Sequence, residues 1–95
     1  MKKTDLAAAI ADRTGLSRSK SREVLTALTD TMMWTLTRGE DVALTRFGRF
    51  SIVDRPARSG RHPQTGAPMR IEAHRAVVFR PGKALREAVS QDSGD

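Results

Sequence analysis

The first apolar pattern in the chain has helical spacing and stops at a glycine. Positions i, i+3, i+4 and i+7 of a narrow stripe are occupied by Leu6, Ala9, Ile10 and Arg13. Lys3 or Thr4 is expected to open this helix. Asp5 then lies in its first turn, where a carboxylate faces the positive end of the helix dipole. Gly15 is a typical C-terminal stop, so the helix is predicted to end just before it.

A second, longer helix is predicted from the N-cap residue Ser17 to about Arg38, with Gly39 as its stop. Its apolar residues share one side: Leu25, Leu28, Met32 and Leu36. Trp34 lies about 180° from Leu25 on the helical wheel and is therefore expected to be exposed. It is either a lone surface aromatic or a contact patch for another protein or for neighbouring dimers. A helix-turn-helix motif is disfavoured because the second helix is too long and too apolar to be a recognition helix.

Beyond Gly39 the apolar residues form short runs that are typical of strands. Two strands are expected around a turn at Phe47-Gly48, and a third over residues 77–79. Pro81 is expected at the first position of a closing helix, because its restricted φ suits that place. The predicted organisation is one domain over residues 1–90, made of two helices (1–39), short strands (40–54 and 76–80), a segment rich in Arg, Pro and Gly (55–75) and a C-terminal helix (81–90), followed by a frayed acidic tail (91–95).

Length and charge narrow the classes of function. The 95 residues suffice for one domain with a thin core, which a partner subunit would help to stabilise. The net charge of +6 is concentrated, because residues 45–86 hold ten of the 17 Lys and Arg and only Asp54 and Glu72 as acids. Such a segment attracts polyanions, chiefly nucleic acid or an anionic membrane. No basic amphipathic helix accompanies it, which argues against a membrane partner.

The sequence contains no residue pattern that is typical of a catalytic site or a metal site. The chain has no cysteine, which suits a reducing cytoplasm, and His62 and His74 lack metal-ligand spacing. Gly82-Lys83 is no P-loop, because the preceding glycine-rich loop and the following Ser or Thr are missing. No Ser-His-Asp or Cys-His set is visible. The sequence therefore predicts a protein that is not an enzyme and that uses no cofactor or metal.

The basic segment contains a strong hairpin signal at residues 62–66, His-Pro-Gln-Thr-Gly. Pro63 suits the second position of a type I turn, and Gly66 can take the left-handed conformation that closes a hairpin. The flanking strands lack the apolar residues to pack both faces, so the hairpin is expected to project as an arm. Guanidinium groups, which suit phosphates and narrow minor grooves, recur along the first limb at Arg55, Arg58 and Arg61. From spacing alone, a role in forming the turn is enough to account for Pro63. The more specific interpretation is that its ring is inserted as a wedge between base pairs.

Three motifs together resemble the HU and integration host factor family of bacterial histone-like DNA-binding proteins. They are Phe47-Gly48-Arg49-Phe50, then Arg58-Ser59-Gly60-Arg61-His62-Pro63-Gln64-Thr65-Gly66, then Phe79-Arg80-Pro81-Gly82-Lys83-Ala84-Leu85. The likeness covers residues 1–90. It implies an α+β fold in an intertwined dimer with a helical dimerisation base (1–39), a β-sheet saddle (40–54 and 76–80) and two protruding β-hairpin arms (55–75). In that family the arms encircle the minor groove and the arm-tip proline intercalates.

The resemblance also implies residue roles. The predicted DNA-binding residues are Lys3, Arg46, Arg49, Arg55, Arg58, Arg61, Pro63, Gln64, Arg70, Arg75, Arg80, Lys83 and Arg86, with Pro63 intercalating. The predicted dimer core consists of Leu25, Leu28, Met32, Leu36, Leu44, Phe47, Phe50 and Phe79.

The function that the resemblance implies is that of an architectural, nucleoid-associated protein of the bacterial cytoplasm. It would bind double-stranded DNA through the minor groove with little sequence specificity, and bend and compact it. A site-selective bender of the integration host factor type is the alternative within the family. An RNA-binding protein is the alternative from another class, although residues 55–75 offer no platform of aromatic side chains for single strands. A homodimer is favoured, and a heterodimer with a paralogue stays open.

Arg46 departs from the family pattern, in which glycine commonly precedes the phenylalanine at Phe47. If this position requires a positive φ, arginine is strained there. The favoured interpretation is that it does not, and that Arg46 adds a cation near the floor of the saddle.

Overall fold

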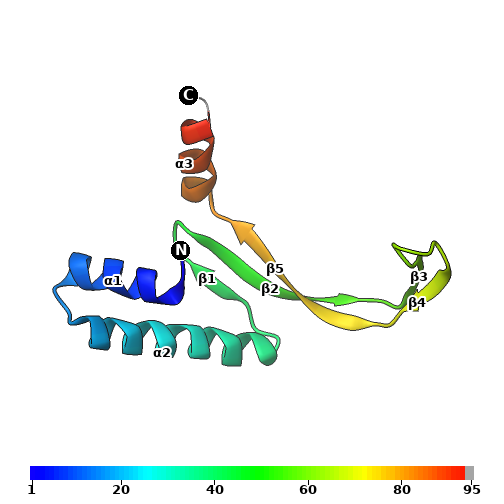
Figure 1. Cartoon of the computed structure of the whole chain (residues 1–95), viewed down its shortest axis with the longest axis horizontal. Coiled ribbons are helices and arrows are strands. Elements are labelled where there is room, and N and C mark those ends of the chain that lie inside the picture. Colours follow the sequence, from blue (N-terminus) through cyan, green and yellow to red (C-terminus); the bar gives the residue numbers. More distant parts are fainter. Residues whose placement is uncertain (94–95) are drawn as a thin grey trace. The chain divides into compact units, whose positions relative to one another are not determined.

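The computed structural model of the chain describes residues 1–93 and divides it into two units, residues 1–38 and the part that begins at Gly39. Helices come first, then strands, then a last helix, which is the expected α+β composition (Figure 1). The elements are α1 (Lys3–Thr14), α2 (Arg18–Thr37), β1 (Val42–Leu44), β2 (Gly48–Arg55), β3 (Arg58–Arg61), β4 (Pro68–Ile71), β5 (His74–Pro81) and α3 (Lys83–Ser93).

Local capping sets the ends of α1 and α2, as predicted. The Asp5 carboxylate accepts a hydrogen bond from the backbone N–H of Lys2 at 2.8 Å, which closes the first turn of α1. Gly15 ends α1 with φ 78°, and its N–H donates to the carbonyl of Ala11. Ser17 caps α2, because its hydroxyl oxygen accepts a hydrogen bond from the backbone N–H of Lys20 at 3.0 Å.

The contact between α1 and α2 uses small side chains that lie beside the predicted stripe of α1. Ala7 and Ala11 are the buried residues of α1, whereas Leu6 is 41% exposed. The rest of the predicted stripe is half-buried or exposed: Ala9, Ile10 and Arg13. On α2 the buried residues are Ser21 and Leu25. Methyl-sized side chains let the two backbones approach closely, so the alanines turn toward α2 and the larger Leu6 lies to the side.

The second unit is built on an antiparallel sheet in the order β1-β2-β5. Its aromatic centre is Phe79, whose ring centroid lies 4.7 Å from that of Phe50 and 5.3 Å from that of Phe47. Gly48 is required beside this cluster, because a Cβ atom there would lie 2.6 Å from the Phe79 ring and from the backbone oxygen of Arg80. The close packing at this end of the central strand thus depends on one residue without a side chain.

The C-terminal helix covers Lys83–Ser93, and the prediction that Pro81 occupies its first position is wrong. Pro81 is the last residue of β5, opposite Gly48, and is not the first residue of a helix. Gly82 separates strand from helix: its N–H donates to the Phe47 carbonyl at 2.8 Å, and its carbonyl accepts the first helical hydrogen bond from Arg86 at 3.0 Å. The strand pairing thereby keeps Pro81 out of the helix. At the other end α3 includes residues 91–93 of the predicted tail, while residues 94 and 95 lie outside the described residues.

The residues predicted to form a dimer core are incompletely covered within one chain. Leu25 is buried, and Met32, Leu36, Leu44 and Phe50 are half-buried. The others are exposed: Leu28 (46%), Phe47 (45%) and Phe79 (37%). No helix among the described residues is long and apolar enough to cross a membrane.

Candidate nucleic-acid interface

The arm, residues 55–75, lies at one end of the second unit. The β2–β5 ladder ends there at the pair Arg55 and His74, and the ribbon of β3 and β4 continues beyond it (Figure 1). The other end of the ladder, at Gly48 and Pro81, leads into α3. The arm is thus a two-stranded ribbon without a third strand among the described residues, as the sequence predicted.

The turn at the tip of the arm is closed by backbone hydrogen bonds. His62 donates its N–H to Ala67 and accepts the N–H of Gly66, each at 2.8 Å, and Gly66 has the left-handed φ of 72°. Arg61 supports the turn, because its Nη1 donates to the Gly66 carbonyl at 3.0 Å. Pro63 follows His62, and every residue from 61 to 70 is exposed, so an apolar ring without an N–H is presented to solvent.

The two faces of the arm differ in chemistry. Residues directly opposite each other share a face, so Arg58, Gly60, Met69 and Ile71 lie on one side of the ribbon. A Cβ atom at Gly60 would lie 3.0 Å from Cδ1 of Ile71, so the isoleucine side chain covers the glycine. The other side carries Ser59, Arg61, Pro68 and Arg70. One face therefore holds a thin apolar strip and the other is polar.

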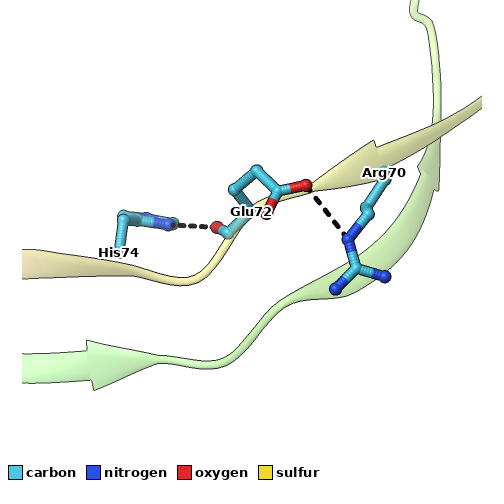
Figure 2. Close-up of polar contacts among 3 residues, drawn as sticks. All are labelled: Arg70, Glu72 and His74. Carbon is cyan, nitrogen blue, oxygen red and sulfur yellow. Dashed lines mark hydrogen bonds and ion pairs between the residues drawn. The ribbon is translucent and has the colours of Figure 1, made fainter.

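An ion pair that the sequence analysis missed lies on the polar face. Nε of Arg70 is 3.0 Å from Oε1 of Glu72, and Nδ1 of His74 lies 3.1 Å from the Glu72 backbone oxygen (Figure 2). Both members of the pair are largely exposed, which makes it weak and open to competition from other ions. Glu72 directly follows the last residue of β4, and side chains two residues apart in an extended segment point to the same side, so the signal was present in the sequence.

The arm joins the saddle sheet through two short connections. Residues 56 and 57 separate β2 from β3, and residues 72 and 73 separate β4 from β5. A shallow concavity at this junction is lined by Asp54, Arg55, Pro56, Ala73, His74 and Arg75. Two of the predicted DNA-binding arginines, Arg55 and Arg75, therefore lie at the base of the arm.

Arg46 adopts φ 74°, so the favoured interpretation of this position is wrong. It belongs to the turn between β1 and β2, where Phe47 donates its N–H to the Leu44 carbonyl at 2.9 Å. A side chain in the left-handed region clashes with its own backbone, which costs roughly 1–2 kcal/mol. Arg46 therefore adds its cation at the expense of backbone strain.

The predicted cations of the saddle surround a second shallow concavity. Arg46, Arg49 and Arg80 line it, together with neighbouring residues of β1, β2 and the end of β5, and Gly82. Arg49 is paired with Asp41 at 2.8 Å, with both side chains partly exposed. The cations of this concavity are thus close to one another but not equally available to an anion.

The remaining predicted cations are exposed on helices. Lys83 lies at the start of α3, 3.9 Å from Glu87, and Arg86 follows one turn later. Lys3 opens α1 in the other unit. Residues 1–93 contain no group of three or more His, Cys, Asp or Glu that could hold a metal ion.

Comparison with known proteins identifies the family. The model of the bacterial DNA-binding protein family matches residues 1–90. The chain belongs to the HU and integration host factor family. Members of this family are architectural DNA-binding proteins and not enzymes. This confirms the prediction of an architectural DNA-binding protein and the prediction that the protein is not an enzyme.

Individual relatives cover nearly the whole chain. It is 47% identical to DNA-binding protein HU-alpha of Pseudomonas aeruginosa over 95% of this chain and all of the relative. It is 43% identical to DNA-binding protein HU of Geobacillus stearothermophilus, over 94% of this chain and 99% of the relative. Integration host factor subunit alpha of an Anaeromyxobacter strain is 35% identical, over all of this chain and 84% of the relative.

A solved structure of the family agrees closely with the fold. The Anabaena HU chain from a cocrystal with DNA superposes with a TM-score of 0.87 at 37% identity, covering 94% of this chain and 97% of the other. The α+β architecture of helices, saddle and arm is therefore that of the HU fold, as predicted.

Proposed function

We propose that this HU-family chain binds double-stranded DNA with its arms in the minor groove, with little sequence specificity, and bends and compacts it. The observation that carries the proposal is the arm itself: a two-stranded ribbon that presents Arg58, Arg61 and Arg70 around an exposed tip at Pro63. A two-stranded ribbon alone in water is only marginally stable. Its persistence without apolar packing on both faces is easier to explain if its surface serves a ligand.

The charge of the interface favours a polyanion that is recognised by the shape of its groove rather than by its base sequence. Guanidinium groups bind phosphates and enter narrow minor grooves, where the negative potential is strongest. The minor groove offers few features that distinguish base pairs, so contacts of this kind discriminate little between sequences. This supports sequence-tolerant binding over site-selective binding. It also supports a location on the bacterial nucleoid in the cytoplasm.

Bending is assigned to Pro63. An apolar ring that is exposed at the tip can be inserted between two base pairs, unstacking the step and kinking the duplex. Smooth bending of a short site costs of order 1–6 kcal/mol, which the additional phosphate contacts of a wrapped duplex offset. Nicked or pre-bent DNA has lost part of that cost, so it is the preferred ligand.

A homodimer completes the proposed binding unit. Phe47 and Phe79 remain exposed in the single chain, although their rings are only 5.3 Å apart, and Leu28 of the first unit is exposed as well. Large apolar side chains that stay uncovered favour association, and a chain of this length gains much from a shared core. Two arms, one from each chain, would then hold one duplex.

The test is a salt titration of binding to an intact duplex of about 30 base pairs, its twin with a central nick, and a matched single strand. The expected result is steeply salt-dependent binding that favours the nicked duplex. Equal or tighter binding to the single strand, or to an RNA of the same sequence, would reject the duplex-bending function.

A further inference from the structure

The side of α2 that faces away from α1 carries an exposed aromatic side chain. Trp34 is 60% exposed and lies on the opposite side of the helix from the buried Ser21 and Leu25. Its neighbour Met33 is 64% exposed. The proposed DNA interface uses neither residue, and neither belongs to the predicted dimer core. This side of α2 therefore has no role in the function proposed above.

Trp34 is held in place by a cation. The guanidinium carbon of Arg38 lies 4.4 Å from the centre of the Trp34 ring, one helical turn further along the chain. Such a cation–π contact orients the indole and reduces the conformational entropy that is lost when the ring is covered. The pair forms a flat, pre-arranged surface rather than a freely rotating side chain.

An acidic residue completes the pattern one turn earlier. Asp30 is exposed on the same side of α2, four residues before Trp34. Its carboxylate makes no hydrogen bond or ion pair with any side chain of the described part of the chain. Along α2 the three positions carry an acidic, an aromatic and a basic side chain in that order, and neighbouring positions are about 6 Å apart along the helix axis.

We propose that this patch, Asp30-Trp34-Arg38, binds the same patch on a second copy of the chain. When two such helices run antiparallel about a two-fold axis through Trp34, the two indoles meet. Each Asp30 then faces the Arg38 of the other copy. A helix with this order of charges is complementary to itself in the antiparallel direction and in no other.

The occupant is a second copy rather than DNA for a chemical reason. Asp30 would repel a phosphate backbone, and a base has no access to Trp34 from an intact duplex. The contact spans about two turns of helix and is far smaller than the roughly 1,000 Å² of a stable interface. It therefore links molecules weakly and acts where they are already concentrated. Because it lies outside the proposed dimer core, it joins dimers to one another.

The test is complementation between variants. D30R makes both ends of the patch basic and R38D makes both acidic, so each variant alone should associate at least about tenfold more weakly than the wild type. An equimolar mixture of the two restores opposite charges at both ends and should regain most of the association. Sedimentation velocity over a range of concentrations measures the mass, and the emission of Trp34 shifts to the blue when the ring is covered.

Two further variants keep the test independent of folding. The double variant D30R/R38D reverses the order of charges, so it should associate with itself like the wild type. K20D and E23R exchange charges elsewhere on α2 and should change nothing, alone or mixed. Helicity by circular dichroism accompanies each sample.

The proposal is overturned if the D30R and R38D mixture gains no mass over its parts, or if W34A associates like the wild type. It is also overturned if folded W34A sediments as a monomer, since Trp34 would then belong to the primary dimer interface. Each readout is independent of DNA, so loss of the proposed DNA-binding function would leave the result unaffected.

Discussion

Nε of Arg70 lies 3.0 Å from Oε1 of Glu72, so one cation of the arm already holds an anion two residues further along the chain. A phosphate that binds Arg70 must compete with this carboxylate. Glu72 and Asp54 are also the only acidic residues between positions 45 and 86.

Removing that competitor should strengthen DNA binding. In E72Q the Arg70 guanidinium is free for a phosphate, and because exposed ion pairs contribute at most about 1 kcal/mol, affinity should rise by about twofold to fivefold. The salt dependence should steepen by up to about 0.9 in log–log slope if one phosphate contact is gained. E23Q, which removes a carboxylate paired with Lys20 in α2, is the matched control for net charge. Weaker binding by E72Q would instead make Glu72 a residue that positions Arg70.

Pro63 should affect bending more than affinity. In P63A the turn still has Gly66 in its left-handed conformation, but the apolar wedge is lost. The bend angle, measured by energy transfer between dyes at the two ends of a duplex, should decrease while the dissociation constant changes by less than about tenfold. P68A, which replaces the proline at the start of β4, serves as the control and should bend DNA normally. An unchanged bend in P63A would eliminate the wedge.

The arginines of the first limb should account for part of the salt dependence. Arg58 and Arg61 are both exposed, so R58A/R61A should reduce the log–log slope by about 1.8 if each contacts one phosphate. The matched control is R18A/R22A, which removes two exposed arginines from α2 and should leave the slope near that of the wild type. Equal slopes for all three proteins would place the phosphate contacts outside the arm.

Arg46 should limit stability through its backbone. With φ at 74°, R46G relieves the left-handed strain and should raise the free energy of unfolding by about 1 kcal/mol, or the melting temperature by roughly 4–8 °C. R46A removes the same charge but keeps the Cβ atom, so it should show little gain. Thermal unfolding at one fixed protein concentration measures the difference. Equal melting temperatures for R46G and R46A would show that the turn is not strained.

Ser17 and Ser21 should respond oppositely to the same substitution. Ser21 is fully buried, and its Oγ has no hydrogen-bond partner, so S21A should stabilise the first unit by up to about 1 kcal/mol. Ser17 caps α2 through a hydrogen bond at 3.0 Å, so S17A should destabilise it by about 1 kcal/mol. Denaturant unfolding of the two variants side by side tests both signs. Destabilisation by S21A would reveal a partner for the hydroxyl, such as a bound water.

Predictions that depend on neighbouring residues in the chain were accurate. Gly15 and Ser17 end and begin helices where expected, because capping joins groups only a few residues apart. The tip of the arm follows the same rule, since Gly66 closes it with a positive φ. The family resemblance, carried by short motifs of the same kind, was confirmed by the match over residues 1–90.

Predictions that depend on a packing partner were less accurate. Which side of α1 is buried follows from the close approach of α2 at Ser21, and this selected Ala7 and Ala11 over Leu6. The start of α3 was misplaced because Pro81 pairs with Gly48 across the sheet. In both cases the deciding residue is distant in sequence, and no local pattern records it.

By itself, the sequence determined the elements, their caps, the basic arm and its tip, because charge, turn chemistry and helical spacing are properties of short segments. Only the tertiary structure decided the burial of Ala7 and Ala11, the pairing of Pro81 with Gly48 and the packing of Phe79 against Phe50. Those features depend on helix packing, strand register and side-chain direction. All three arise only when the backbone has folded and brought particular atoms within a few ångströms of one another.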